Sequence, residues 1–103
     1  MRDIRCRGKS IYTDKWITGY YIGTGTLCKY GDEHWYVDDE TVGQFTGLFD
    51  KNGNRIYEGD VMNNAGNVVG FCNGSFCING DSDLALWTKT EVIGNIHDNP
   101  ELR

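Results

Sequence analysis

The stretch from Thr41 to Val61, TVGQFTGLFDKNGNRIYEGDV, contains the clearest turn signal in the chain. Apolar residues flank a polar tetrapeptide at 50–53, Asp-Lys-Asn-Gly, on both sides. An Asp at the start of a turn accepts a local backbone N–H, and a Gly near its end adopts the positive φ that closes a hairpin with a bulge. The stretch therefore predicts a hairpin at 50–53, with Gly53 at positive φ.

A second bend is predicted just before the end of this stretch. Gly59 allows a sharp change of direction, and the carboxylate of Asp60 is placed to accept a nearby backbone N–H. Val61 and Met62 then begin a new apolar run. We therefore expect a strand that leaves this bend.

Alternating polar residues in the first turn invite comparison with a calcium-binding loop. Asp50, Asn52 and Asn54 have the spacing of the first three ligands of an EF-hand. An EF-hand loop needs Gly at its sixth position and Glu at its twelfth, whereas this chain has Arg55 and Val61 there. The sequence therefore predicts a plain turn and no calcium site.

Short alternations of apolar and polar residues make up most of the remaining chain. Fourteen Gly and one Pro indicate many tight turns. No segment of roughly ten or more residues has helical periodicity. The sequence therefore predicts an all-β, single-domain, barrel-like fold of short antiparallel strands over residues 1–103, with little helix. Besides the run at Val61, the expected strands are 3–7, 15–22, 26–30, 34–37, 42–46, 67–72, 75–78, 84–87 and 91–96.

Several boundaries of these strands are predicted from local signals. Gly8 and Lys9 are expected to turn the first strand, and the acidic run at 38–40 is expected to close the strand before it. Gly19, inside a strand, indicates a bulge or a close backbone contact. The segment 84–87 is either a strand or a short helical turn, and the strand is favoured. Further turns are expected at 31–33, at 63–66 and at 73–74. From residue 57 onward the succession of bend, strand, turn and return strand resembles the SH3-like barrels.

Four cysteines are present, and their spacing does not match a structural zinc site. Such a site usually has two close ligand pairs, whereas Cys72 and Cys77 form the one close pair and His34 and His97 are far apart. In a hairpin with a two-residue loop at 73–74, Cys72 and Cys77 are diagonal neighbours about 7–8 Å apart. That separation is too large for an unstrained disulfide. We therefore expect reduced, partly buried thiols and no zinc.

Length and hydropathy limit the class of protein. A chain of 103 residues corresponds to one domain. It has no apolar run near 18 residues, so no membrane-spanning helix is expected. The segment 1–7 has no apolar stretch behind its charges, so it is not expected to act as a signal peptide. The expected location is therefore the cytoplasm.

Charge is distributed unevenly over the chain, whose net charge is -5. Residues 1–30 carry six basic and two acidic side chains, whereas residues 31–60 carry two basic and eight acidic ones. An acidic chain repels phosphate, so binding to duplex nucleic acid is disfavoured. The cations Arg2, Arg5, Arg7 and Lys9 are nevertheless close enough in sequence to form a local basic face, or a solvated strand edge.

Aromatic side chains are more numerous than a core of this size requires. Aromatic residues are enriched at the centres of protein interfaces, so an exposed group of them would indicate a binding surface. Any single one of them is more often a core residue. The candidate interaction surface comprises Trp16, Tyr20, Trp35, Tyr36 and Trp87.

Specific strings over the whole chain resemble one family. The tract GQFTGLFDKNG at 43–53, followed by IYEGDV at 56–61, resembles the YopX family of phage and prophage proteins. So do RDIRCR at 2–7, WITGY at 16–20 and EVIGNIHDNPEL at 91–102. Cys6 stands where the family more often has an aromatic residue, and Phe49 where it more often has Lys. The resemblance implies a phage-encoded, mostly β protein that acts in the bacterial host cytoplasm, and it implies no established activity or catalytic residues.

Two functions are compatible with these observations. The first is a non-enzymatic interaction module that binds a host or phage protein through the acidic middle segment or through the exposed aromatics; self-association is left open. The alternative is a small β-barrel that binds single-stranded nucleic acid by stacking bases on aromatics in a basic groove that includes Lys15 and Lys29. An enzyme is not expected, because no recognisable nucleophile, phosphate-binding or H-E-x-x-H motif is present. No catalytic, cofactor or metal residues are predicted.

Overall fold

The computed structural model describes residues 5–29 and 33–103. The chain separates into two compact units, Met1–Phe45 and Thr46–Arg103. A single domain over residues 1–103 stays a prediction. Over the described ranges the chain is mostly antiparallel β-sheet with no α-helix, as predicted, and none of its helical segments is long and apolar enough to cross a membrane. The predicted strand start at residues 3–4, the strand end at residue 30 and most of the turn at 31–33 lie outside the described residues.

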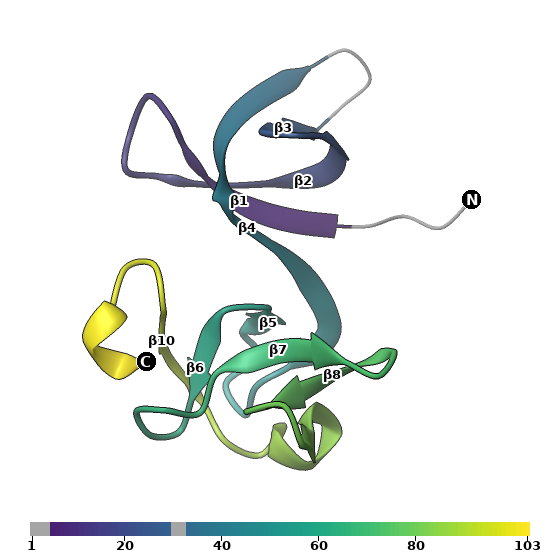
Figure 1. Ribbon diagram of the computed structural model, residues 1–103, viewed down its shortest axis with the longest axis vertical. Helices are drawn as coiled ribbons and strands as arrows, with labels where there is room; N and C mark the ends of the chain where they lie inside the picture. Colours follow the sequence, from purple (N-terminus) through teal and green to yellow (C-terminus); the bar gives the residue numbers. More distant parts are fainter. Residues whose placement is uncertain (1–4, 30–32) are drawn as a thin grey trace. The chain divides into compact units, whose positions relative to one another are not determined.

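The first unit is a ring of four antiparallel strands. It contains β1 (Arg5–Ser10), β2 (Trp16–Gly23), β3 (Thr26–Cys28) and the first part of β4 (His34–Phe49). Each strand pairs with the next, and β4 also pairs with β1 (Figure 1). The barrel-like arrangement predicted for the fold therefore takes the form of a ring-like sheet.

The interior of this ring is small and apolar. Cys6, Leu27 and Val37 are almost fully buried, and Ile17 and Val42 pack against them. These residues come from all four strands of the ring. Alternate residues of a strand point to the same face, so each strand can direct apolar side chains into the interior. Gly19 of β2 makes the close backbone contact that was predicted, since a Cβ there would lie 2.8 Å from the carbonyl oxygen of Cys28.

Strand β1 does not turn at Gly8 and Lys9, so that prediction is wrong. Gly8 lies inside the ring, where a Cβ would be 2.8 Å from Cγ2 of Val37. The glycine is needed for close packing and not for a turn. The chain turns at 11–14 instead, where the Ser10 hydroxyl accepts the backbone N–H groups of Tyr12 and Thr13.

The acidic run at 38–40 does not end a strand, because β4 continues through it to Phe49. The pairing with β1 jumps from Arg7–Gly43 to Lys9–Asp38, so residues 39–42 form a large β-bulge. The bulge is fastened by Thr41, whose hydroxyl oxygen accepts the N–H of Lys9 at 2.8 Å. The polar run at 38–40 is therefore part of one long strand, whose pairing with β1 is interrupted there by the bulge.

The second unit consists of short strands and two 3-10 turns. The end of β4 pairs with β5, β10 pairs with β6, and β7, β8 and β9 form a three-stranded sheet. The predicted SH3-like character of this part is not confirmed and stays a prediction. Its elements are β5 (Arg55–Tyr57), β6 (Asp60–Met62), β7 (Val69–Cys72), β8 (Ser75–Ile78), β9 (Ser82–Asp83), η1 (Leu84–Trp87), β10 (Val92–Asn95) and η2 (Pro100–Leu102).

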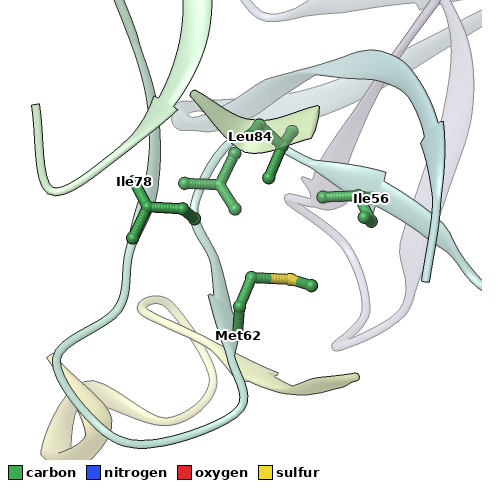
Figure 2. Close-up of a cluster of buried hydrophobic side chains, with 5 residues drawn as sticks. Ile56, Met62, Ile78 and Leu84 are labelled. Carbon is green, nitrogen blue, oxygen red and sulfur yellow. The ribbon is translucent and has the colours of Figure 1, made fainter. Parts of the chain in front are cut away.

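One apolar cluster holds the second unit together. Figure 2 shows Ile56, Met62, Ile78 and Leu84, whose side chains come from four different elements and point into a common interior. Val69 completes the cluster, and all five side chains are at most 2% exposed. Leu48, Phe76, Trp87 and Val92 pack around it.

The turns predicted in this unit are confirmed. Gly53 has φ 82° and Gly59 has φ 89°. The carboxylate of Asp60 accepts the N–H of Tyr57 at 2.8 Å. Asn73 and Gly74 both have positive φ, as a two-residue hairpin loop requires.

The segment 84–87 is a 3-10 turn, so the favoured prediction of a strand is wrong. Asp83 caps it, because its carboxylate accepts the N–H of Ala85 at 3.0 Å. Leu84 is fully buried whereas Leu86 is 80% exposed. The turn therefore inserts Leu84 into the core, and the half-buried Trp87 packs against the same cluster.

Candidate interaction surface

Strands β1 and β2 bring cations and aromatic rings together on one face. The register pairs Arg5 with Tyr20 and Lys9 with Trp16. Arg7 lies between these pairs on the same face, because alternate residues of β1 point away from the buried Cys6. We call these five side chains, Arg5, Arg7, Lys9, Trp16 and Tyr20, the basic–aromatic face.

Each cation of this face lies over a ring. The guanidinium carbon of Arg7 is 4.7 Å from the centre of the Trp16 ring, and the Lys9 ammonium is 5.6 Å from it. The guanidinium carbon of Arg5 is 5.5 Å from the Tyr20 ring, and Arg5 Nη2 donates to the Tyr20 hydroxyl at 3.0 Å. Stacking of this kind restricts an arginine while its N–H edge keeps the planar fork that matches a carboxylate or phosphate.

A mostly apolar pocket occupies another part of the first unit. Its volume is about 360 Å³, within the range of roughly 300–1,000 Å³ typical of small-ligand sites. Tyr36 is 51% exposed, and Trp35 is half-buried with the Lys29 ammonium 4.9 Å from its ring. The pocket is lined by Ser10, Tyr12, Thr13, Lys15, Ile17, His34, Trp35 and Tyr36.

The indole nitrogen of Trp35 is the least satisfied polar atom of this pocket's lining. It is buried and has no hydrogen-bond acceptor within the part of the chain that the structure describes. A buried indole N–H usually finds an acceptor. Trp35 thus contributes apolar surface to the pocket lining, whereas its ring nitrogen is itself buried.

The remaining predicted aromatic, Trp87, belongs to the second unit. It is half-buried and packs against the apolar cluster around Leu84. The five predicted aromatics therefore fall into three groups: Trp16 and Tyr20 on the basic–aromatic face, Trp35 and Tyr36 at the pocket, where Trp35 also lies under Lys29, and Trp87 at a core. Arg5, Arg7 and Lys9 were expected from the sequence to form a basic face or a strand edge, but they were not combined with the predicted aromatics into one surface.

Acidic side chains near the bulge are engaged inside the first unit. Asp39 Oδ1 accepts the N–H of Gly25 at 2.9 Å and the hydroxyl of Tyr21 at 3.0 Å. Asp38 Oδ1 accepts the N–H of Glu40 at 3.1 Å. The hydrogen bond to Asp39 raises the pKa of the Tyr21 hydroxyl. These carboxylates therefore stabilise local backbone geometry.

Comparison with known proteins identifies the family. The family model described as YopX protein matches residues 10–102. This chain belongs to the YopX family. A search of curated proteins found no match. The matched region contains all five predicted aromatics, whereas Arg5, Arg7 and Lys9 of this YopX protein precede it.

Metal ligands do not gather in this YopX protein over residues 5–29 and 33–103, where no three His, Cys, Asp or Glu side chains come together. The absence of zinc and calcium stays a prediction, to be tested on the purified protein. Asp50, the first residue of the excluded calcium loop, is 6% exposed, and its carboxylate accepts backbone N–H groups.

Cysteine geometry differs from the prediction in one place. Cys72 and Cys77 are diagonal neighbours on β7 and β8, as the register predicted, but their sulfur atoms are 2.7 Å apart. The prediction that the diagonal keeps them too far apart is therefore wrong. The register places Gly70 opposite Cys77 and Ser75 opposite Cys72, so the contact between the two sulfur atoms runs across the diagonal of the hairpin.

Proposed function

We propose that this YopX-family protein is a non-enzymatic, phage- or prophage-encoded binding module that engages an acidic segment of a host or phage protein. The basic–aromatic face is the proposed contact surface. The observation that carries the proposal is the alternation of Arg5, Arg7 and Lys9 along one strand, each over a ring of the neighbouring strand. In an extended acidic segment alternate side chains also face one way, with the same period.

Stacking of the cations favours a carboxylate partner over a nucleic acid. Single-stranded nucleic acid is held by bases that stack on aromatic rings. Here Arg7 and Lys9 lie over Trp16, and Arg5 lies over Tyr20, so the protein's own cations compete for those ring faces. The net charge of -5 also opposes a polyphosphate. Single-stranded nucleic acid therefore remains the alternative partner and becomes an outcome of the test.

Acidic residues of the middle segment are less suited to be the contact surface. Asp39 accepts bonds from Gly25 and Tyr21, and Asp60 accepts the N–H of Tyr57. Carboxylates used in this way are already compensated and contribute less to a partner's binding. The pocket beside Trp35 and Tyr36 offers room for an apolar side chain of the partner.

The test measures binding of defined probes to the purified protein. Fluorescein-labelled oligoglutamate, oligoglutamine and oligothymidylate are titrated at low and at physiological salt. We expect oligoglutamate to bind with an affinity that falls as salt rises, because the attraction is screened, and oligoglutamine to bind much more weakly. Stronger binding of oligothymidylate than of oligoglutamate would replace the proposal with the nucleic-acid alternative.

Matched variants separate charge from the stacked geometry. Arg5→Gln with Arg7→Gln should weaken oligoglutamate binding by about tenfold, whereas Lys51→Gln with Lys89→Gln removes two exposed cations of the second unit and should leave it unchanged. Trp16→Leu keeps all charges and should still weaken binding, because the cations above it lose their support. If the Lys-to-Gln pair weakened oligoglutamate binding as much as the Arg-to-Gln pair, binding would depend only on the total charge of the protein. A pull-down from host lysate, with and without nuclease, then identifies the partner.

A further inference from the structure

The β7–β8 hairpin places two thiols in direct contact. Cys72 donates its S–H to the sulfur of Cys77 at 2.7 Å. A disulfide bond needs a separation of about 2.05 Å, so the two sulfur atoms have to approach by roughly 0.7 Å. The hairpin loop at Asn73 and Gly74 and the paired strands on both sides hold the two residues in this register.

The two thiols differ in access. Cys77 is 3% exposed, whereas Cys72 is half-buried and is 3.4 Å from the carbonyl oxygen of Gly80. A reagent therefore meets Cys72 first, and Cys77 lies behind it as a second thiol. An accessible attacking thiol beside a resolving thiol is the arrangement found in reversible redox pairs.

We propose that Cys72 and Cys77 form a reversible disulfide by exchange with a low-molecular-weight disulfide. The proposal is independent of the basic–aromatic face. The pair is a dithiol while small disulfides are scarce, and it is oxidised when they accumulate.

The exchange takes place in two balanced steps. Cys72 loses its proton and attacks one sulfur of the small disulfide, which forms a mixed disulfide and releases one small thiol that takes up a proton. Cys77 then loses its proton and attacks the Cys72 sulfur, which forms the intrachain disulfide and releases the second small thiol. The two protein thiols are oxidised by two electrons, and the small disulfide is reduced by the same two electrons.

Alkaline pH should accelerate the first step. The pKa of the Cys72 thiol is raised, mainly by its hydrogen bond to Cys77. Burial and the charges of Cys77 and Asp81 act in the same direction and contribute less. Because the thiolate is the attacking species, a raised pKa slows exchange near neutrality. The rate of exchange should increase as pH rises through the alkaline range.

The experiment uses oxidised glutathione on the reduced full-length protein. Samples are quenched by alkylation, and their disulfides are located by mass spectrometry of the intact chain and of its peptides. With the alkylation carried out in denaturant, which exposes every thiol, we expect two thiols to be lost together, a link between Cys72 and Cys77, and continued alkylation of Cys6 and Cys28. Excess reduced glutathione should reverse the reaction. A wild-type protein that accumulates glutathione on Cys72 without forming the link would overturn the proposal.

Two substitutions give matched controls. Cys77→Ser keeps the accessible thiol and removes the second one, so glutathione should remain attached to Cys72. The mixed disulfide at Cys72 in the wild type should be at least roughly tenfold less abundant under the same conditions, because the second thiol acts at a high effective concentration. Cys72→Ser should leave Cys77 largely unmodified, because Cys77 is buried; rapid modification of Cys77 in that variant would contradict the proposed order of attack.

Discussion

Asp50 connects the central turn with the last strand of the second unit. Its Oδ1 accepts the N–H groups of Asn52 and Asn54 at 2.9 and 2.8 Å, and its Oδ2 accepts the N–H of Val92 at 3.0 Å. Burial by itself acts to raise the pKa of this carboxyl, but the hydrogen bonds from Val92, Asn54 and Asn52 outweigh it and hold the pKa below its usual range. The charged form is therefore the form that stabilises the fold.

This arrangement predicts a pH dependence of stability. A carboxyl with a lowered pKa in the folded state contributes stability above its unfolded pKa of about 3.9 and loses it as pH falls through the folded value. We expect the free energy of unfolding to decrease below about pH 4. Asp50→Asn should flatten this decrease and cost about 1–3 kcal/mol at neutral pH. Urea unfolding at a series of pH values measures both effects.

The control for this prediction is a carboxylate that is exposed to solvent and not buried like that of Asp50. Asp14→Asn removes an exposed carboxylate from the loop at 11–14 and tests whether the number of charges alone produces the pH dependence. If the Asp50 variant kept the full acid-induced loss of stability, the hydrogen bonds to its carboxylate would not be its source.

Gly53 provides a test of backbone strain without a steric clash. Its φ is 82°, and a Cβ built there meets nothing within 4 Å. Gly53→Val should destabilise the protein by about 1–3 kcal/mol, because a β-branched residue is strained in this region. Cys28→Ser, a change at a half-buried thiol, should cost less. Cys6→Ser is expected to cost less as well, by a narrower margin since Cys6 is 3% exposed.

Gly70→Ala is the matched control for Gly53→Val. A Cβ at Gly70 also meets nothing within 4 Å, and its backbone is not in the left-handed region. Urea unfolding of the variants should show a large loss only for Gly53. Wild-type stability of Gly53→Val would mean that the central turn is not the one described here.

At the scale of elements, the ring of the first unit closes through a small residue. Gly8 of β1 lies against Val37 of β4, and an added Cβ would be 2.8 Å from Cγ2. Gly8→Ala should therefore cost about 1–3 kcal/mol through overpacking. Val37→Ala in the same chain should restore part of that loss, because it removes the clashing methyl groups. Unfolding of the two single variants and the double variant measures the coupling, and strict additivity would contradict the close packing.

The turn η1 offers a second test at this scale, and its control residue lies two positions further along the same turn. Leu84 is fully buried and Leu86 is 80% exposed. Leu84→Ala should cost about 2–5 kcal/mol, because it leaves a cavity in the apolar cluster. Leu86→Ala should stay within about 0.5 kcal/mol of wild type. If this segment were a strand, residues 84 and 86 would face the same side, and their alanine variants would lose similar amounts of stability.

At the scale of the whole molecule, each unit has its own small apolar cluster. The first contains Cys6, Leu27 and Val37, and the second is built around Ile56 and Leu84. Since the ligand spacings fail and no three potential ligands gather over residues 5–29 and 33–103, the fold should form without metal. A chelator is expected to leave the melting temperature unchanged. A fall of several degrees on chelation would reveal a metal site.

Local chemistry carried most of the successful predictions. The turn at 50–53, the bend at Gly59 and the loop at 73–74 depend on residues that act within a few positions of themselves, so their sequence is sufficient. The loop length also places Phe71 opposite Phe76, and their rings meet edge to face at 5.0 Å. The face that they share was expected to belong to the core, but this is wrong for Phe71, which is 55% exposed. The family could also be identified from the sequence, because its distinctive strings are contiguous.

Tertiary packing decided the features that local chemistry misjudged. Gly8 looked like a turn residue, but Val37, distant in sequence, requires its small size. The run at 38–40 looked like a strand end, but pairing with β1 on both sides makes it a bulge. The segment 84–87 was compatible with a strand or a helical turn, and the structure has the turn, which the Asp83 carboxylate caps.

By itself, the sequence determined the β-rich class, the tight turns of the second unit at 50–53, 59 and 73–74 and the YopX family, because these depend on composition, short-range hydrogen bonds and contiguous motifs. Only the tertiary structure decided which aromatics lie under cations, which line a pocket and which one packs on a core. It also brought the sulfur atoms of Cys72 and Cys77 to 2.7 Å, because the distance between two diagonal sulfur atoms depends on how both side chains are turned, which the strand register does not fix.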